Sequence, residues 1–521
     1  MKTTRILYHL AWADFLERTR RYSFLVMLGL VLWIGYVSAS GQFAISVSPN
    51  YVGVINSAWV GATMALTASF TLGLVGFYIV KGSVARDYVT GVGQIMASTP
   101  MSRLRYMFGK WLSNYAVLAI SVVILALAGI GMNLWFGSGG LNLAVLVAPL
   151  LLIALPWLGF VAAMAVLFES VAWLRGGLGN MVYAIWWLTL ISVSTVPAAV
   201  TGSSLSPYLD ITGFQIFTDS VTSSARAVYP DATLMSFGAG LTRVDPGFFP
   251  YTGVQWTGEV LLSRLLFLLL AVGLVVLAAV LFDRFDPARL PRVKRMASAQ
   301  EPAPAAAGEP IPAADIHLTP LSAAATRFRF GALLAGELKL FMKGQRWWWY
   351  VVAAGLIVLQ LFRPADEQLY PLIAAWVWPV LILSGLGCRE RRFNTRQIVY
   401  SAPRPLSQLP AGWLSAVLVM VLLGCGSLAR FLVAGEWVAA LGWLTAIVFV
   451  PSLALALGTL TGSGKLFEAL YVLWLYGLLQ QMAAIDFAGV VPDSRFYVFA
   501  LAAIGLLAVA ALVRGRQVRG I

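Results

Sequence analysis

The chain has few charged residues and very little histidine or cysteine. Of its 521 residues, 11% are charged and 60% are hydrophobic. A soluble domain carries about a quarter charged residues, and long apolar runs need a bilayer to cover them, so this composition indicates a membrane protein. His9 and His317 alone cannot supply a multi-histidine metal or haem site, and Cys388 and Cys425 cannot form a disulfide framework.

The apolar runs also lack ionisable residues. Carriers coupled to protons or sodium keep a few such residues inside the membrane, although each costs about 2.5–3.5 kcal/mol on insertion scales. Here the candidates lie at the ends of the runs, and no proton relay is evident. They are Glu169, Arg175, Glu259, Arg264, Lys465 and Glu468.

Catalytic motifs are missing as well. There is no catalytic triad, no HExxH and no pair of carboxylates at helical spacing in a core. Residues 461–466, TGSGKL, resemble a Walker A loop, but Thr459 stands where its first Gly belongs and Leu466 replaces the Ser or Thr that holds magnesium. We therefore expect a chain that is not an enzyme, does not hydrolyse ATP and binds no cofactor or metal itself.

What the sequence does contain is a long series of apolar segments. They predict an all-α polytopic membrane protein with twelve transmembrane helices. The predicted spans are 23–40, 57–80, 111–135, 145–167, 179–200, 258–282, 347–362, 371–387, 412–428, 437–460, 466–484 and 496–513.

The positive charge, +14 net, lies mostly on one side of the predicted membrane spans and not in a single surface patch. With these spans, most of the 36 Lys and Arg fall on one side, while the opposite loops 41–56 and 136–144 carry none. This is the positive-inside pattern, so we expect a multi-pass protein of the cell (plasma or inner) membrane with both termini cytoplasmic. The basic charge then reflects topology and contact with lipid, and we expect no nucleic-acid partner.

Two polar, basic inserts at 82–110 and 388–410 interrupt the apolar runs and align with one another. Internal repeats of this kind indicate duplicated structural units. The aligned pairs are Arg86 and Arg389, Asp87 and Glu390, Gly91 and Asn394, Gln94 and Gln397, Ser98 and Ser401, Pro100 and Pro403, and Ser102 and Ser407, with Arg103 following Ser102.

A short basic loop that fixes topology would explain the arginines of the inserts. It would not explain an acidic residue beside Arg in both copies, or the turn-capable Gly91 and Asn394 at matching places. Nor would it explain a short helix-like segment that ends before Pro100 and Pro403 at one spacing. We therefore interpret the inserts as docking surfaces.

The repeat predicts two pseudo-repeated six-helix halves. The first half, 1–282, would hold an interfacial helix at 4–21, the insert 82–110 and an extracytoplasmic loop at 201–257. The second half, 326–521, would hold an interfacial helix at 331–346 and the insert 388–410, and the Ala/Pro-rich stretch 283–325 would be a flexible cytoplasmic linker. The loop 201–257 is long enough for re-entrant or short interfacial helices, and a plain surface loop is the alternative.

The inserts resemble the coupling elements of permeases of type-2 ATP-binding-cassette (ABC) exporters. The first copy carries that family's pattern at Arg86, Asp87, Gly91, Ser98, Pro100, Ser102, Arg103, Gly109 and Lys110, and the second at Arg389, Glu390, Ser401, Pro403 and Ser407. Gln94 and Gln397 stand where the family usually has Glu. The resemblance implies an exporter permease with two separate ATPase subunits docked on the two inserts, which hold the ATP and Mg themselves. Its cargo would be amphipathic or hydrophobic: a peptide, drug or lipid.

Two other classes remain open from the residues alone. An ion-coupled secondary transporter can also have twelve spans in two halves, and it would need carboxylates embedded in the membrane. A polytopic enzyme acting on lipids or glycans would need polar catalytic residues at a membrane face, and only the loop at 201–257 could supply them.

Overall fold

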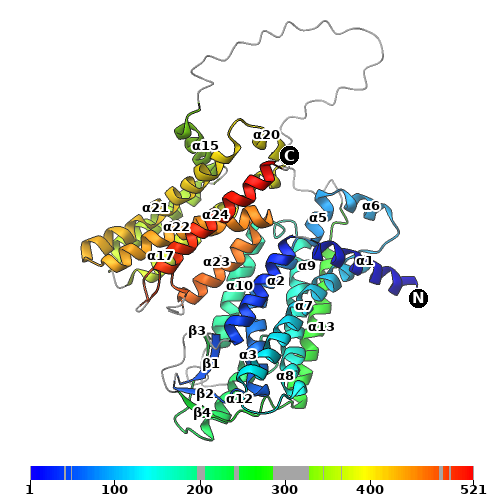
Figure 1. Cartoon of the computed structure of the whole chain (residues 1–521). Helices are drawn as coiled ribbons and strands as arrows, with labels where there is room; N and C mark the ends of the chain where they lie inside the picture. Colours follow the sequence, from blue (N-terminus) through cyan, green and yellow to red (C-terminus); the bar gives the residue numbers. More distant parts are fainter. Residues whose placement is uncertain are drawn as a thin grey trace.

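The computed structural model describes residues 2–20, 22–39, 43–48, 50–195, 206–239, 246–285, 328–343, 345, 347–364, 367–479, 485–491 and 494–519 (Figure 1). Within these ranges, eight helices are long and apolar enough to cross a membrane. They are Ser57–Tyr88, Arg103–Phe136, Leu143–Ser170, Gly177–Ser194, Gly258–Leu281, Pro405–Ala434, Trp437–Thr461 and Tyr497–Arg519. The chain is therefore a predominantly helical membrane protein.

The helices of residues 1–285 form one bundle. Several begin at polar residues of the types preferred as helix N-caps: the side chain of Asn56 accepts from Trp59 N, that of Ser102 from Arg105 N, and that of Thr257 from Val260 N. The helices are α1 (Lys2–Thr19), α2 (Tyr22–Ala39), α3 (Ser57–Thr67), α4 (Gly73–Val80), α5 (Ser83–Val89), α6 (Val92–Ser98), α7 (Arg103–Phe136), α8 (Leu143–Pro149), α9 (Leu155–Ser170), α10 (Gly177–Thr195), α12 (Phe214–Arg226) and α13 (Gly258–Leu281). Wider π-helical turns at Ala68–Leu72 and Leu150–Ala154 join α3 to α4 and α8 to α9.

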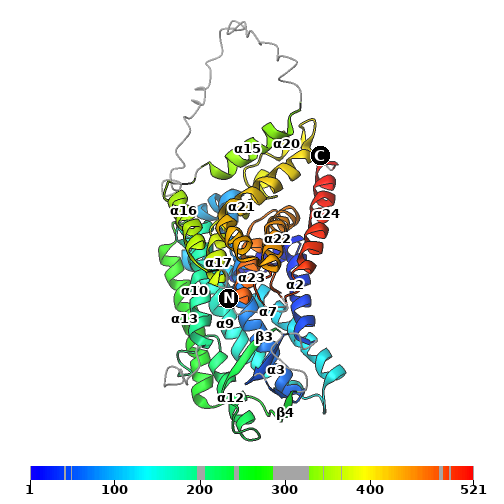
Figure 2. The same ribbon diagram turned by 90° about the vertical axis from the view of Figure 1, so that its left-hand side faces the viewer.

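The helices from residue 328 onward form a second group, which lies beside the upper part of the first in Figure 1 and overlaps that part in the turned view of Figure 2. They are α15 (Phe330–Met342), α16 (Trp347–Phe362), α17 (Leu369–Val377), α18 (Val380–Leu383), α19 (Arg389–Arg392), α20 (Arg396–Tyr400), a 3₁₀ turn at Pro405–Ser407, α21 (Gln408–Ala434), α22 (Trp437–Thr461), α23 (Lys465–Leu479) and α24 (Tyr497–Arg519). The two groups meet where α23 packs against α4 and α10, and where α2 packs against α22.

Eight of the twelve predicted spans coincide with the membrane-length helices. The segment 371–387 is divided into α17 and α18 at Pro379, which cannot donate a backbone N–H to a continuous helix. The segment 347–362 forms a helix of only 16 residues, which Arg363 and Pro364 follow. The apolar part of α2 is Leu28–Ser38, and α23 has 15 described residues because 480–484 lie outside the described part of the chain. Twelve spans and the duplication of the halves therefore stay predictions.

A four-stranded sheet was not predicted. Its strands are β1 (Phe43–Val47), β2 (Tyr51–Gly53), β3 (Met235–Ala239) and β4 (Gly247–Phe249), in the order β3-β1-β2-β4. The strands have three to five residues each and come from two loops far apart in the sequence, so no local pattern indicated their pairing. Together with α12, the sheet shows that the described part of the loop 201–257 is folded.

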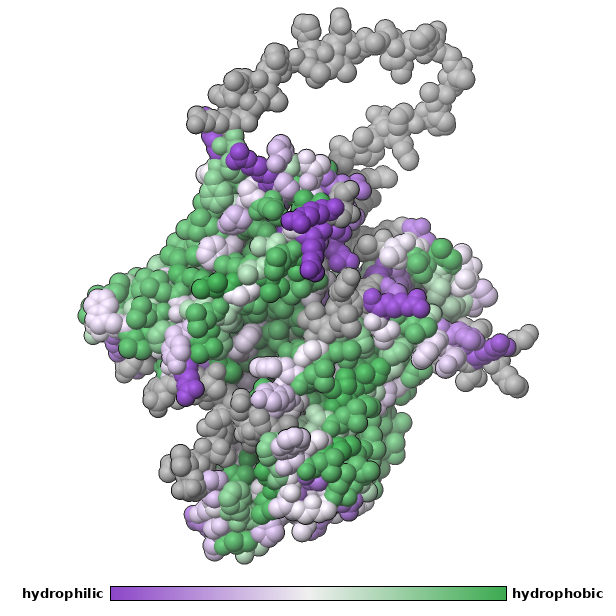
Figure 3. Space-filling model, viewed as in Figure 1, coloured by the Kyte–Doolittle hydropathy of each residue, from purple (hydrophilic) through white to green (hydrophobic). Residues whose placement is uncertain are grey.

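The inserts and the sheet lie at opposite ends of the molecule. Helices α1, α5 and α6 lie toward the same end as α15 and α20, whereas the strands and α12 lie at the other (Figure 1). Hydrophilic residues gather on the side of the inserts, and apolar residues cover the long helices (Figure 3). Most of the predicted linker 283–325 lies outside the described residues.

Candidate docking site at the two basic inserts

The first insert is a helix–turn–helix that projects between two long helices. Helix α5 continues the α3–α4 span, α6 follows after Gly91, and α7 begins the next span after Pro100. Gly91 has φ +75°, a left-handed conformation that a side chain disfavours, and this lets the chain reverse between the two short helices. The predicted short helix before Pro100 is thus present as α6.

Glu169, near the end of α9, fixes the start of α5. Its carboxylate accepts hydrogen bonds from the backbone N–H groups of Gly82 (2.5 Å), Ser83 (3.1 Å), Val84 (2.5 Å) and Ala85 (2.9 Å). These are the N–H groups that a helix start leaves without partners, and a buried negative charge there also complements the helix dipole. The first insert is therefore attached rigidly to α9.

A buried ion network joins α5 to α1 and α7. Lys110 Nζ lies 2.8 Å from Asp14 Oδ1 and 2.9 Å from Asp87 Oδ2, and Arg86 pairs with Asp14 and, at 2.5 Å, with Glu17. The Tyr106 hydroxyl donates to Asp87 at 2.6 Å. Because opposite charges alternate in a buried site, the network holds α1, the first insert and α7 together.

The same first insert is attached to the end of α13. The Tyr88 hydroxyl donates to Asp283, and Arg175 pairs with Asp283 at 2.9 Å. Burial alone would raise the pKa of Asp283, but these two donors hold its pKa below the ordinary value. Asp283 is therefore a charged anchor for α5 at neutral pH.

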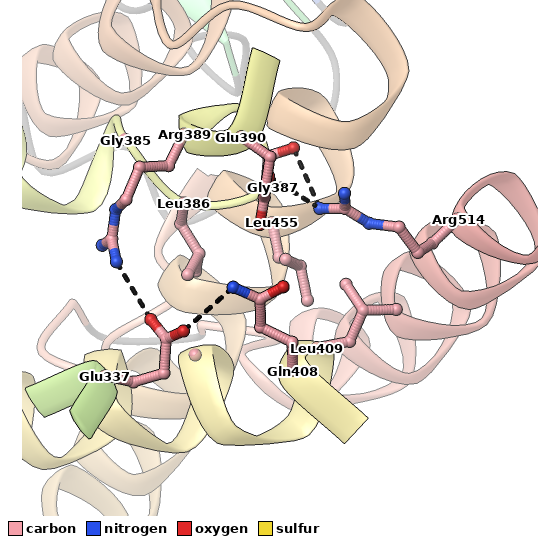
Figure 4. Close-up of a pocket in the computed structure, with 11 residues that line it drawn as sticks. Glu337, Gly385, Leu386, Gly387, Arg389, Glu390, Gln408, Leu409, Leu455 and Arg514 are labelled. Carbon is pink, nitrogen blue, oxygen red and sulfur yellow. Dashed lines mark hydrogen bonds and ion pairs between the residues drawn. The ribbon is translucent and has the colours of Figure 1, made fainter. Parts of the chain in front are cut away.

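The second insert has a corresponding set of contacts (Figure 4). Arg389 Nη1 lies 2.9 Å from Glu337 Oε2 on α15, and Gln408 donates to the other oxygen of Glu337 at 3.1 Å. Glu390 is paired with Arg514 of α24 at 3.3 Å, and Arg514 also donates to the Tyr400 hydroxyl. In each insert, the Arg of the aligned pair binds an acidic residue of α1 or α15, and the next carboxylate binds a base on a long helix.

The two turns also correspond. Asn394 has φ +55°, like Gly91 at the aligned position, and asparagine tolerates this conformation better than most residues. After each turn comes a short helix, α6 or α20. In both helices the aligned serine closes the last turn: Ser98 donates to Ile95 O at 2.8 Å and Ser401 to Ile398 O at 3.1 Å.

The structure divides the predicted docking residues into two groups. Asp87 and Glu390 are buried, and Arg86 and Arg389 are partly buried in the networks above; Gly91 and Ser407 are half-buried. The exposed members gather on and after the short helices. They are Gln94, Ser98, Pro100, Ser102, Arg103, Asn394, Gln397, Ser401 and Pro403.

Sequence reasoning missed two kinds of residue. The first is the anchors: Asp14, Glu337 and Arg514 were not singled out, and Glu169 and Lys110 were noted without this role. Their signal was the presence of isolated charges beside apolar segments in both halves. The second is a matched pair of exposed apolar residues. Ile95 is 67% and Ile398 76% exposed, and they occupy aligned positions on α6 and α20. Their signal was the repeated Gln-Ile dipeptide.

The fold and the inserts together define a helical membrane protein with two rigidly held surface helices at one end. No family model, curated protein or solved structure matches the chain. Within the described residues, no group of three or more His, Cys, Asp or Glu could hold a metal ion.

Proposed function

We propose that the chain is the permease of an ABC exporter, with two separate ATPase subunits docked on α6 and α20. One observation carries the proposal. Two inserts far apart in the sequence each present a short helix with an exposed isoleucine at the aligned position, Ile95 or Ile398. An apolar residue exposed in a polar, basic setting favours contact with a protein partner.

The networks beneath the helices suit a mechanical role. If a partner subunit is to move the spans, the insert that it contacts must be held firmly to those spans, because a flexible loop would absorb the movement. Here the pairs of Arg86 and Arg389 with the interfacial helices, and of Asp87 and Glu390 with Lys110 and Arg514, join each insert to its own group of spans. In this proposal, these four residues transmit force, whereas the exposed residues make the contact.

The remaining parts of the proposal concern arrangement. The two groups of helices would be duplicated six-span halves, with the inserts and both termini on the cytoplasmic side of the cell membrane. The matched anchors, turns and short helices support duplication, and the basic character of the insert end supports that orientation. ATP closing the two ATPase subunits would move the inserts and rock the halves between two states.

A cavity between the halves supports an apolar or amphipathic cargo. It has a volume of about 120 Å³ and lies between α10 on one side and α17, α18 and α23 on the other. Its walls are almost wholly apolar and include Tyr78, Ile185 and Tyr476, and Glu468 is the one charged residue among the described residues that line it. A site of this character would accept hydrocarbon groups rather than sugars or ions.

An ion-coupled carrier is the second candidate, and Glu468 is the observation that favours it. This carboxylate is 6% exposed at the meeting of α23 with the first half, where it accepts a hydrogen bond from Asn180 at 2.5 Å. A buried carboxylate between two halves is a feature of ion-coupled carriers. Replacing Glu468 by Gln would abolish transport in such a carrier, but would leave ATP-driven transport largely unchanged.

The proposal is tested by purifying the tagged chain in mild detergent from its native membrane and counting the proteins that accompany it. We expect two nucleotide-binding subunits per chain, lost when the exposed faces of α6 and α20 are made polar. The control is a chain altered equally in the loop 138–142 at the other end. If no ATPase accompanies the chain even after cross-linking, and transport stops with an uncoupler while ATP is held constant, the ion-coupled carrier is the better account.

A further inference from the structure

A second recess between the halves lies next to the inserts and has not been used above. It has a volume of about 270 Å³, and both halves contribute to its walls. Lys81, Gly82, Ser83 and Arg86 come from the first half, whereas Arg391 and the loop 461–466 come from the second. That loop is the TGSGKL sequence that resembles a Walker A motif.

The charge of this recess is of one sign. Among the described residues that line it, Lys81, Arg86, Arg391 and Lys465 are basic and none is acidic. Two of these charges are engaged elsewhere: Arg86 pairs with Asp14, and Lys81 Nζ donates to Leu174 O and to Asn180 Oδ1. The other two, both from the second half, are Lys465, whose Nζ donates to Lys81 O, and the exposed Arg391.

Glycines bring these two cations close to the backbone. A Cβ built at Gly82, where φ is +115°, would overlap Lys465 Nζ. A Cβ built at Gly462, where φ is +66°, would overlap the Arg391 guanidinium. Lys465 Nζ also donates to Lys81 O across the boundary between the halves. The two glycines therefore leave space for the cationic groups of Lys465 and Arg391 at the recess.

Apolar side chains also line the recess, and three of them, Val80, Val117 and Leu466, are buried. Phe24, Ile79, Val80, Val117 and Leu466 come from α2, α4, α7 and α23. A recess with a cationic rim and an apolar floor is complementary to an amphiphile with an anionic head. Arg and Lys together suit a compact anion with several acceptor oxygens, because the guanidinium binds two of them side by side and the ammonium neutralises charge.

We propose that this recess binds the phosphate-type head group of an anionic amphiphile, with Arg391 and Lys465 on the phosphate and the apolar floor against its tail. Because both halves form the site, occupancy changes the relative stability of their arrangements. Taking the amphiphile as the transported cargo rests on the proposed function; the binding itself does not.

The test measures binding to the purified full chain in phosphate-free neutral detergent by calorimetry, without ATPase subunits. The probes are dihexanoyl phosphatidic acid, dihexanoyl phosphatidylcholine and inorganic phosphate. Phosphatidic acid should bind at least about tenfold more tightly than the other two, since charged hydrogen bonds and apolar contact both contribute. Arg391→Gln should weaken this binding about tenfold.

The matched control is Arg392→Gln. Arg392 is the next exposed arginine of α19, lies over the Phe393 ring at 5.7 Å, and does not line the recess. Its substitution should change affinity by less than about twofold, and equal thermal stability of the two variants shows that both are folded.

Two results would overturn the inference. If Arg391→Gln and Arg392→Gln weaken phosphatidic acid equally, the effect is general surface charge and not this recess. If inorganic phosphate binds as tightly as phosphatidic acid, the source of the phosphate is a soluble anion and the amphiphile is excluded. If no ATPase copurifies with the chain, the proposed function fails but these binding results are unchanged. Failure of the proposed function can therefore be told apart from failure of this inference.

Discussion

Replacing Lys110 by Met should destabilise the protein by about 3–5 kcal/mol, because it removes one partner from a buried ion network. The Lys110 side chain is 4% exposed and contacts the carboxylates of both Asp14 and Asp87. Removing its charge leaves these carboxylates close together. Arg86 still faces both of them, which places the expected loss at the lower end of this range.

Two further ion pairs provide a graded comparison with the same substitution. Arg389→Met breaks the pair with Glu337, whose side chains are 25% and 7% exposed, and should cost about 1–2 kcal/mol because solvent screens it partly. Arg363→Met breaks an i,i+4 pair with Glu367 whose side chains are 55% and 51% exposed. This loss should be below about 0.5 kcal/mol.

The assay is unfolding of the purified chain by SDS in mixed micelles, followed by circular dichroism. Each variant is combined with neutralisation of its partner, for example Asp87→Asn, to separate the pair's interaction from the loss of packing. The expected order of loss is Lys110, then Arg389, then Arg363. Equal losses, or a larger loss for Arg363 than for Lys110, would refute the argument that burial makes the insert rigid.

Three other predictions follow from the inserts. Glu169→Ala leaves four backbone N–H groups of α5 without their acceptor, so hydrogen exchange of residues 82–85 should accelerate at least about tenfold, whereas Glu169→Gln should have a smaller effect. At the turns, Gly91→Ala and Asn394→Ala should each cost about 1–2 kcal/mol by SDS unfolding, while Asn394→Gly should be neutral or stabilising; equal effects of Ala and Gly at 394 would exclude backbone strain. The folded pKa of Asp283 is depressed, so its stabilisation is present above the unfolded pKa of about 3.9 and is lost as pH falls through the folded pKa. The stability difference between wild type and Asp283→Asn should therefore vanish in acid, and a constant difference would contradict the assignment.

The features that the sequence predicted well were those with a local signal. Apolar length alone located eight membrane-length helices. Turn chemistry at Gly91 and Asn394 and the stops before Pro100 and Pro403 predicted two short helices, which are present as α6 and α20.

The parts that escaped prediction depend on contacts between distant segments. The pairing of β1 with β3 joins residues almost two hundred positions apart, and strands this short have no periodicity of their own. Likewise, nothing in the insert showed that Arg86 would face Asp14, 72 residues earlier, or that Glu169 would cap α5. The aligned charges could be seen in the sequence. Whether their side chains would be buried against the protein or exposed to solvent depended on the packing of α1 and α9 against the insert.

The interruption at Pro379 illustrates a third limit. Composition made 371–387 resemble a span, yet a proline inside a helix removes one hydrogen bond, and neighbouring helices decide whether the chain continues or breaks. In this chain α17 ends at Val377 and α18 begins at Val380. Hydropathy alone could not distinguish the two outcomes.

The most direct test of the central claim is photo-cross-linking in cells. A photoreactive residue is placed at Ile95 or Ile398, and as controls at Leu134 or Val433, which are 69% and 82% exposed near the other ends of α7 and α21. The account predicts adducts with a nucleotide-binding ATPase from both isoleucine positions and from neither control. Adducts to lipid alone at Ile95 and Ile398, or equal ATPase adducts at all four positions, would contradict it.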